Sequence, residues 1–497
     1  MTTLGSSFRV EPARLAGTVA DRIGHGARFA GLVASARRDG STVLRVVLAT
    51  RRRLEVIEAE LAPGAKGYPA LTPLVPAASW YERELHDLFG LEPEGPLRLD
   101  PLVLPLREGA GPPRPGSPEA CGRVELDTSP LGGHVSGEGV FTIPYGPVRS
   151  GVFESVEYLV ETTGEEIPHL RTRVYHKHRG LERRFGELGV DDAVLLAERV
   201  EGTSSVAHAW AFAQAVETLA GVEVPRAAQL VRVVHAELER VAVHLDSAIR
   251  HSEGAGQAVA YARLSRHKEE VLRLRARLCG HRFGRGVVVP GGVTAGPLLG
   301  PEDALERAGG LDAAITSDLA ALGRTPSFLD RLRRTGRIPP DLAGLRGALG
   351  PVGRGSGRLD DVRADRPYGA YRHLGFEPAV GFEEGDALSR HQVRVVEIRQ
   401  AFHLVRQGLD ELSRAGAGPW RLPVGAVSGL ALASVEAPQG ELLYLVEAEA
   451  GRLARVKPRC ASFHNLALFS EAFGGDIFTD FVFIEASFGL SVAGVSG

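Results

Sequence analysis

The sequence WYERELHDLFG, at residues 80–90, places three acidic residues, an arginine and a histidine within the six positions 82–87. The motif then closes on the apolar pair Leu88-Phe89 and on Gly90. A charge cluster of this kind is most often the solvated end of a helix, which is the simplest interpretation of the motif. The sequence before the motif predicts the kind of domain in which the motif lies.

The first hundred residues predict a small α/β domain. Residues 12–23 have the amphipathic spacing of a helix. Residues 31–38 and 41–50 have the character of two strands, and an Arg-Asp-Gly turn at 38–40 is placed to join them. Residues 101–140 are instead rich in proline and glycine and lack periodicity, which predicts a linker.

From residue 141 the pattern changes to that of a mainly helical domain. Long helices are predicted at 193–221, 224–250, 257–282 and 387–414. Residues 431–457 alternate like a β-hairpin with its turn at positions 450 and 451. The predicted fold class is therefore α+β, with a small N-terminal α/β domain at 1–100 and a large, mainly α-helical domain with small β additions at 141–497.

The composition excludes several classes of function. The formal net charge of −3 gives no basic field, so nucleic acid is not an expected partner. The three cysteines, Cys121, Cys279 and Cys460, form no CxxC pair, which argues against a disulfide framework or a zinc ribbon and fits a cytoplasmic compartment. The sequence has no Rossmann fingerprint and no run of about 18 apolar residues. We therefore expect neither NADH binding nor a membrane span in this chain.

Seven short motifs follow one another in the second domain. Each alone is weak evidence, and their order across most of the domain is the informative feature. They are YGP at 145–147, HRGLE at 178–182, ERVEGTSSVAH at 198–208, PGGV at 290–293, GPVGRGSGRLDDV at 350–362, EAPQGE at 436–441 and SFHN at 462–465.

These motifs resemble a known family. Residues 80–90 resemble the ERExxDxxG signature of the thirty-kilodalton subunit of complex I. The seven later motifs resemble those of the forty-nine-kilodalton subunit and of the large subunit of group 4 nickel–iron hydrogenases. A small domain fused ahead of the large one resembles the large subunits of the formate-hydrogenlyase type. The resemblance implies a hydrogenase-large-subunit-like fold for residues 141–497.

The resemblance also locates the nickel–iron ligand positions. Family members that hold the metals have cysteines where this chain has Glu201, Ser204, Ser491 and Gly494. Soft thiolates suit nickel and iron, whereas a serine hydroxyl is a hard, weak ligand. None of the three cysteines falls at these places in the motifs. We therefore expect no nickel–iron centre, and no metal, in this chain.

Complex I implies another use for such a vacated cavity, the binding of a quinone headgroup by a loop histidine and a tyrosine. This chain has Arg149 and Gly202 at those two positions. We take Arg149, together with Arg199, Glu201 and His208, as candidates for an acceptor or quinone cavity, and we assign no catalytic residue.

Each of these candidates has a structural alternative. His208 lies on an apolar stretch where a satisfied core histidine is common. Arg199 and Glu201 could pair with other charges of their helix. His244, His464 and Asn465 are interpreted as structural.

Arg179 matches the arginine that, in the family, lies against the terminal iron–sulfur cluster of a neighbouring subunit. A fixed cation there raises the potential of the cluster. The alternative is a salt bridge from Arg179 to Glu182 or Glu198.

These features predict an electron-transfer subunit that takes electrons from a partner iron–sulfur subunit toward quinone. The expected partners are a small, hydrogenase small-subunit-like iron–sulfur subunit and membrane-arm subunits, and the expected location is the inner face of the cell membrane. A non-catalytic scaffold or coupling subunit is the alternative, and a working nickel–iron hydrogenase is the least favoured one.

Overall fold

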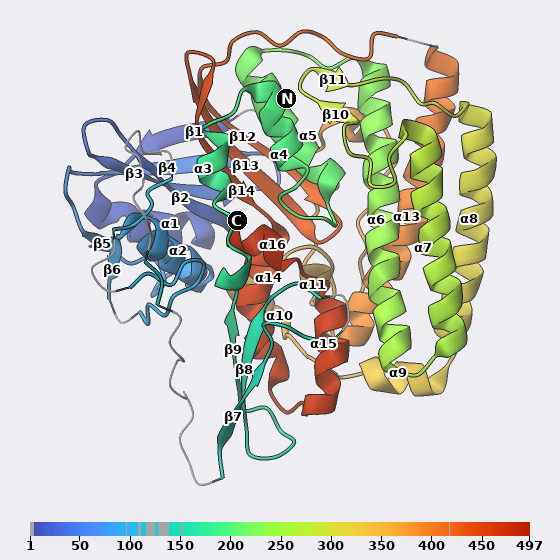
Figure 1. The fold of residues 1–497 in the computed structure, drawn as a ribbon, viewed down its shortest axis with the longest axis horizontal. Helices are drawn as coiled ribbons and strands as arrows, with labels where there is room; N and C mark the ends of the chain where they lie inside the picture. The colour runs from blue at the N-terminus through green and yellow to red at the C-terminus, as the bar shows by residue number, and fades with distance from the viewer. Residues whose placement is uncertain are drawn as a thin grey trace.

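The computed structural model describes residues 4–95, 97–107, 111–115, 125–127, 139–150, 153–416 and 418–497. An N-terminal sheet and a C-terminal sheet lie side by side, and a bundle of long helices flanks them (Figure 1). The predicted α+β class is confirmed.

The N-terminal sheet has the strand order β1-β4-β3-β2, with β1 parallel to β4 and the other pairs antiparallel. Its strands are β1 (Leu4–Arg9), β2 (Arg28–Ala36), β3 (Thr42–Ala49) and β4 (Leu54–Leu61). Helix α1 (Pro12–Gly24) packs on β4 and buries its apolar face. The helix predicted at 12–23 and both predicted strands are confirmed.

The charged motif at 80–90 lies on α2 (Ser79–Phe89), and its three carboxylates are buried. Glu82 accepts hydrogen bonds from the amides of Leu71 and Thr72, at 2.7 and 3.0 Å. Asp87 accepts from three successive amides at residues 102–104, at 2.8–3.2 Å. Glu84 pairs with Lys457 at 2.6 Å. The interpretation as a solvated helix end is wrong, because Glu82 and Asp87 satisfy the backbone of the segments on either side of α2 and Glu84 forms an ion pair.

Most of the predicted linker at 101–140 lies outside the described residues. The described part includes Leu102, Val103 and Leu104, whose side chains are buried against the N-terminal domain. The division into domains at 1–100 and 141–497 stays a prediction.

The C-terminal sheet consists of β12 (Gly429–Ala437), β13 (Gly440–Glu449) and β14 (Arg452–Arg459), antiparallel and in that order. The turn predicted at 450 and 451 joins β13 to β14. The segment has three strands rather than two, because residues 437–440 form a second turn.

The two sheets pack against each other. Leu432, Leu443 and Leu445 of the C-terminal sheet share an apolar cluster with Val33 and Val56 of the N-terminal sheet. At the rim of this contact, Arg45 of β3 pairs with Glu447 of β13 at 3.2 Å. The N-terminal domain is thus fixed to the strands that carry the EAPQGE motif.

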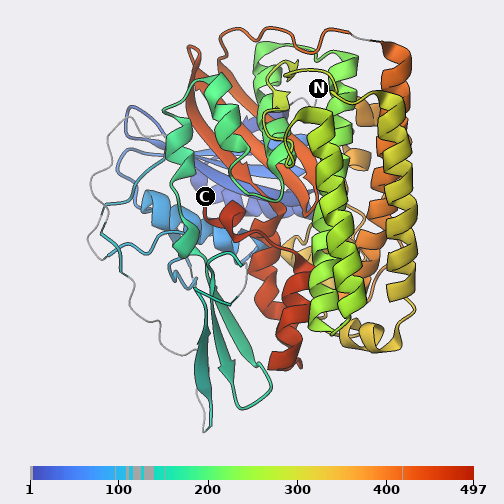
Figure 2. The same cartoon turned by 45° about the vertical axis from the view of Figure 1, so that its right-hand side comes forward.

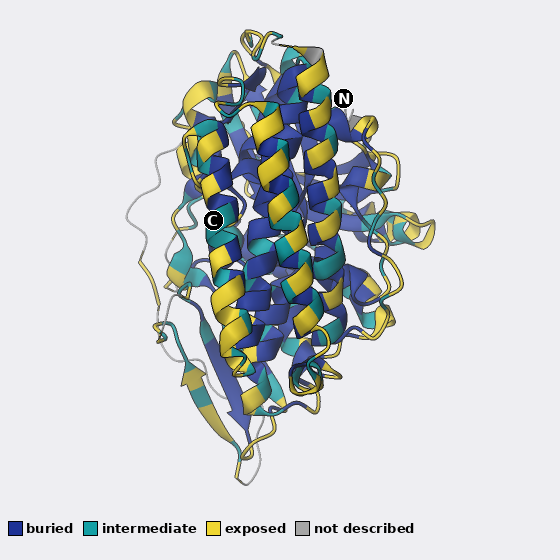
Figure 3. Cartoon of the chain, turned by 90° about the vertical axis from the view of Figure 1, so that its right-hand side faces the viewer, coloured by how far each residue is buried: buried dark blue, intermediate teal, exposed yellow. Residues whose placement is uncertain are grey.

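The helical bundle contains α6 (Arg226–Gly254), α7 (Ala258–Cys279), α8 (Pro301–Leu322) and α13 (Ala387–Ala415). Figures 2 and 3 show these helices side by side, with exposed residues on the outer face and buried residues turned inward. This arrangement follows from their amphipathic spacing. The helices predicted at 224–250, 257–282 and 387–414 are confirmed, with ends shifted by a few residues.

Shorter elements complete the fold. A three-stranded sheet of β7 (Phe141–Tyr145), β8 (Glu157–Thr162) and β9 (His169–Arg173) projects away from the two larger sheets (Figure 2). The remaining strands are β5 (Gly67–Pro69), β6 (Glu92–Glu94), β10 (Val288–Val289) and β11 (Gly292–Val293). The remaining helices are α3 (Leu181–Phe185), α4 (Val190–Ala197), α5 (Ser205–Ala220), α9 (Pro326–Leu332), α10 (Pro340–Arg346), α11 (Gly350–Arg354), α12 (Val362–Asp365), α14 (Ala461–Phe469), α15 (Phe481–Phe488) and α16 (Val492–Ser496). Short 3-10 turns lie at Pro76–Ala78, Tyr175–Lys177, Gly369–Arg372, Ser470–Phe473 and Phe478–Asp480.

Among the described residues, every helix is too short or too polar to cross a lipid bilayer.

Candidate functional site

The loop at residues 198–204 interrupts the helix that was predicted to run from 193 to 221. Helix α4 ends at Ala197 and α5 begins at Ser205, so the prediction of one continuous helix is wrong. The first amides of α5, those of Val206 and Ala207, donate to the carboxylate of Glu239 on α6 at 2.9 and 3.1 Å. A buried carboxylate from another helix therefore caps α5 and stabilises the break.

Glu201 lies in this loop and is buried. One carboxylate oxygen lies 3.8 Å from Nε2 of His208, whose Nδ1 contacts the Tyr444 hydroxyl at 2.8 Å. The other oxygen of Glu201 has no hydrogen-bond partner among the described residues. A side chain added at Gly494 would overlap this oxygen. Two of the four positions that the resemblance assigns to lost metal ligands, 201 and 494, thus lie together, and Glu201 fills the space between them.

The other two vacated positions have their own partners. Ser204 donates to the side-chain oxygen of Gln439 at 2.7 Å. Ser491 donates to Glu154 at 3.2 Å, and the Ala493 amide donates to the same carboxylate at 2.7 Å. Both hydroxyls therefore serve as hydrogen-bonding groups between the segments of the site.

Cys460 is a neighbour that the motifs did not identify. Its sulfur lies 2.9 Å from the place of a side chain at 494. Burial raises the pKa of the Cys460 thiol to about 12, and the nearby Glu201 contributes to the increase. The thiol is therefore protonated at neutral pH and is a poor metal ligand. Within the described residues, no group of three or more histidine, cysteine, aspartate or glutamate side chains is placed to hold a metal ion.

A cavity opens beside the vacated positions, with about 860 Å³ of space including its open mouth. Thr203 and Gln439 line it next to Ser204, and Leu490 and Val492 line it on either side of Ser491. The wall also carries polar and charged groups from α6, α13 and α15, among them His244, Asp246, Arg250, Arg394 and Glu485. A cavity with a few convergent polar groups is the usual form of a small-molecule site.

Arg149 is the candidate residue that lines this cavity. Its guanidinium forms a two-point ion pair with Glu485, at 3.0 and 2.8 Å, and lies over the ring of Phe153 at 4.4 Å. Burial alone would lower the pKa of Arg149, but Glu485 outweighs it and the pKa is raised. Arg149 is thus a fixed cation at the cavity wall.

The other candidates lie elsewhere. Glu201 and His208 form the closed pair described above, outside the wall of this cavity. Arg199 is half exposed and contacts Glu198 at 3.5 Å and the Leu195 carbonyl at 2.6 Å.

Arg179 joins the two segments that carry the vacated positions. Its guanidinium donates to the carbonyls of Arg199 and Val200 in the loop at 198–204, and to the carbonyl of Ala493 at 3.0 Å. Burial lowers the pKa of Arg179, while Glu154 and Glu201 oppose this shift. The salt bridges considered for Arg179 are made by other cations: Glu182 contacts Lys457 and Arg455, and Glu198 contacts Arg199.

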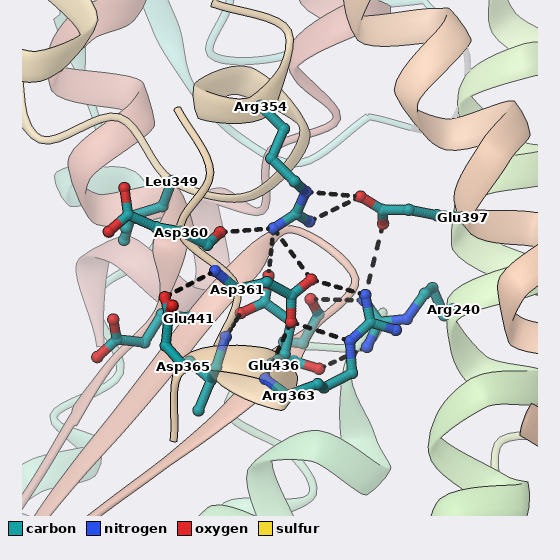
Figure 4. A network of polar contacts seen from close by, with 12 residues as sticks. Arg240, Leu349, Arg354, Asp360, Asp361, Arg363, Asp365, Glu397, Glu436 and Glu441 are labelled. Atoms are coloured by element: carbon teal, nitrogen blue, oxygen red, sulfur yellow. Dashed lines mark hydrogen bonds and ion pairs between the residues drawn. The ribbon is translucent and has the colours of Figure 1, made fainter. Parts of the chain in front are cut away.

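A buried ionic network (Figure 4) is joined to the cavity wall through the contact of His244 with Glu397. Arg354 contacts Glu397 at 2.7 Å, Glu436 at 3.0 Å and Asp361 at 3.3 Å. Further members are Glu237, Arg240 and Arg363. The sequence motifs included residues 350–362 and 436–441 without assigning a role to these charges. A signal was available, since Glu237, Arg240 and His244 recur at helical spacing among the buried residues of α6.

Comparisons with known proteins agree with this architecture. The family model of the respiratory-chain NADH dehydrogenase 49 Kd subunit matches residues 254–422, and that of the 30 Kd subunit matches residues 18–115. A carbon monoxide-induced hydrogenase of Rhodospirillum rubrum is 31% identical over 332 residues, which span 65% of this chain and 90% of that protein. A subunit of the NADH-quinone oxidoreductase of Anaeromyxobacter dehalogenans is 31% identical, over 69% of this chain and 92% of that protein. Formate hydrogenlyase subunit 5 of Escherichia coli is 29% identical, over 82% and 73%.

The fold, the fused order of the two parts and these matches define an oxidoreductase subunit of the complex I and hydrogenase type. The chain belongs to the family of the complex I 49-kilodalton subunit and the related hydrogenase large subunits, with a 30-kilodalton-type domain fused ahead of it.

Proposed function

We propose that this chain is the subunit of a membrane-associated, complex-I-like oxidoreductase that carries the acceptor site. It takes electrons from the iron–sulfur cluster of a partner subunit and passes them to a quinone in the cavity beside the vacated ligand positions. The chain itself holds no nickel–iron centre. It docks at the inner face of the cell membrane through its partners.

The cavity is the observation that carries this proposal. It lies beside the positions that the family resemblance assigns to metal ligands, and its wall has a fixed cation, Arg149, that can stabilise negative charge on a reduced headgroup. Arg179 supports the electron-transfer role, because it connects the loop at 198–204 to the C-terminal segment and is exposed. A cation between these two segments favours the binding of a partner subunit whose iron–sulfur cluster lies close to it.

An Arg149→Met variant of the assembled complex tests the quinone site. Loss of one charge-assisted hydrogen bond is expected to raise the KM for a short-chain quinone about tenfold or more. Quinone reduction is followed spectrophotometrically with the complex's own electron donor. The matched control is Arg183→Met, which removes an exposed arginine that pairs with Glu187 at 3.8 Å. Equal KM values for the two variants would argue against a role of Arg149 in binding quinone.

A scaffold or coupling subunit is the second candidate function. The observation in its favour is that Glu201 fills the space at Gly494 and that Glu485 neutralises Arg149. Both Glu201 and Arg149 are therefore already engaged in contacts within the protein. An assembled wild-type complex that transfers electrons elsewhere but reduces no quinone would favour this role.

The purified chain is expected to contain no nickel. Glu201, Ser204, Ser491 and Gly494 offer no thiolate, and the nearby Cys460 thiol is protonated at neutral pH. Elemental analysis by mass spectrometry checks this, with a cysteine-bearing relative prepared in parallel as the positive control. About one nickel per chain would restore the hydrogenase alternative.

A further inference from the structure

His244 lies on α6 and lines the same cavity as Arg149 and Gln439. Its imidazole is buried, and Nε2 lies 2.7 Å from a carboxylate oxygen of Glu397 on α13. The other ring nitrogen, Nδ1, has no hydrogen-bond partner among the described residues. Core histidines such as His235 and His267 also have a ring nitrogen without a hydrogen-bond partner in the part of the chain that the structure describes, but among these His244 is the one that lines the cavity.

The carboxylate of Glu397 is held in place from its other side. Arg354 donates to it through Nε at 2.8 Å and its Nη2 lies 2.7 Å from the same oxygen, while Arg240 lies 3.9 Å away (Figure 4). Burial alone would raise the pKa of Glu397, but Arg354 and His244 outweigh it and the pKa lies well below its usual range. Glu397 is therefore ionised and can only accept hydrogen bonds.

The state of Glu397 fixes the tautomer of His244. The charged groups that face the imidazole are Glu397 and Arg394 from α13 and Arg240 from α6. Burial lowers the pKa of His244 to about 4, against the opposing effect of Glu397 and with the two arginines adding to the decrease. The neutral ring donates its Nε2 proton to Glu397, which leaves the lone pair of Nδ1 free to accept a proton.

We propose that His244, oriented by Glu397, is the group that accepts and returns the headgroup proton in the cavity; this inference rests on the proposed quinone site. In quinol oxidation, both O–H bonds break. One proton passes to Nδ1 of His244, and the imidazolium is stabilised by Glu397. The second proton leaves through the cavity mouth, and the two electrons pass singly to the iron–sulfur cluster of the partner subunit. Quinone reduction runs the same transfers in reverse.

Equilibrium binding provides a test that does not depend on turnover. Because Nδ1 is an acceptor, the wild-type complex is expected to bind a short-chain quinol roughly tenfold more tightly than the corresponding quinone, the ratio given by one hydrogen bond. Isothermal titration calorimetry under anaerobic conditions measures both affinities. Equal affinities in the wild-type complex would overturn the inference without any variant.

Two substitutions test the roles of the two ring nitrogens of His244 separately. His244→Gln places an amide nitrogen toward Glu397 but removes Nδ1, and it is expected to abolish the preference for quinol. His244→Asn places an amide oxygen near the position of Nδ1 and is expected to restore part of it. The matched control is His267→Gln, because His267 forms the same kind of pair with Asp318, at 2.8 Å, away from the cavity. Thermal unfolding shows that each variant is folded.

The outcomes distinguish the inference from the function on which it rests. A folded His244→Gln complex that keeps the wild-type preference for quinol overturns the role of His244 alone. A wild-type complex that binds neither quinol nor quinone overturns the proposed function and the role of His244 together.

Discussion

Replacing Arg354 by methionine is expected to lower the free energy of unfolding by about 3–5 kcal/mol, the usual cost of removing one partner from a buried ionic network. The guanidinium is fully buried and contacts the carboxylates of Glu397, Glu436 and Asp361. Without it, three buried acids remain with too few cations. Urea unfolding at pH 7, followed by tryptophan fluorescence, measures the loss.

The loss should depend on pH in a defined direction. Burial and the neighbouring Asp361 raise the pKa of Glu436 to about 7 from its ordinary value of 4.5, so even in the wild type its ionisation costs stability as the pH rises through that range. For Asp361 burial would raise the pKa, but Arg363 and Arg354 lower it, so its contribution is lost as the pH falls. In Arg354→Met these acids take up protons more readily. The difference from wild type should therefore be largest above pH 7 and decrease in mild acid.

Arg266→Met is the control for this substitution. Arg266 pairs with Glu270 at 3.5 Å on the exposed face of α7, and its loss should change the free energy of unfolding by less than about 0.5 kcal/mol. A similarly small effect of Arg354→Met would mean that the network carries little net stabilisation.

The network also indicates which parts of the fold could be predicted from the sequence. Helices α1, α7 and α13 were predictable because each buries one face, which gives a regular apolar spacing within a single segment. The turn at 450 and 451 was predictable because the residues on either side of it alternate like strands, which is also a local pattern. Such patterns reflect the contact of each element with the core, and they do not depend on which distant segments pack against that element.

The features that were missed depend on residues far apart in the sequence. The break at 198–204 is stabilised by Glu239, which lies more than thirty positions further along the chain. Two acids of α2 are buried because backbone amides on either side of the helix need acceptors. The pair of His244 with Glu397 was not predicted, because the two residues are 153 positions apart. The four vacated ligand positions were located through family motifs, and the cavity beside them is visible only in three dimensions.

Replacing Gly350 by alanine is expected to lower the free energy of unfolding by about 4 kcal/mol, as a sum of backbone strain and overpacking. Gly350 has a φ of 57°, and a Cβ there would overlap the carbonyl oxygen of Gln439 and lie 2.7 Å from Cα of Gly440. Two backbone segments, the start of α11 and the turn between β12 and β13, are in direct contact at this point. Neither can move without displacing Gln439 from the cavity wall and Arg354 from its carboxylates.

Gly381→Ala is the matched control for this contact. Gly381 also has a positive φ, of 85°, but a Cβ there would meet no atom within 4 Å. It therefore isolates the backbone cost, about 1 kcal/mol. Urea unfolding of both variants at pH 7 separates this cost from that of the steric overlap, and quinol binding by the surviving folded fraction reports on Gln439. If the two variants lose the same amount of stability, the packing of Gly350 against the turn is not what holds the GPVGRGSGRLDDV motif in place.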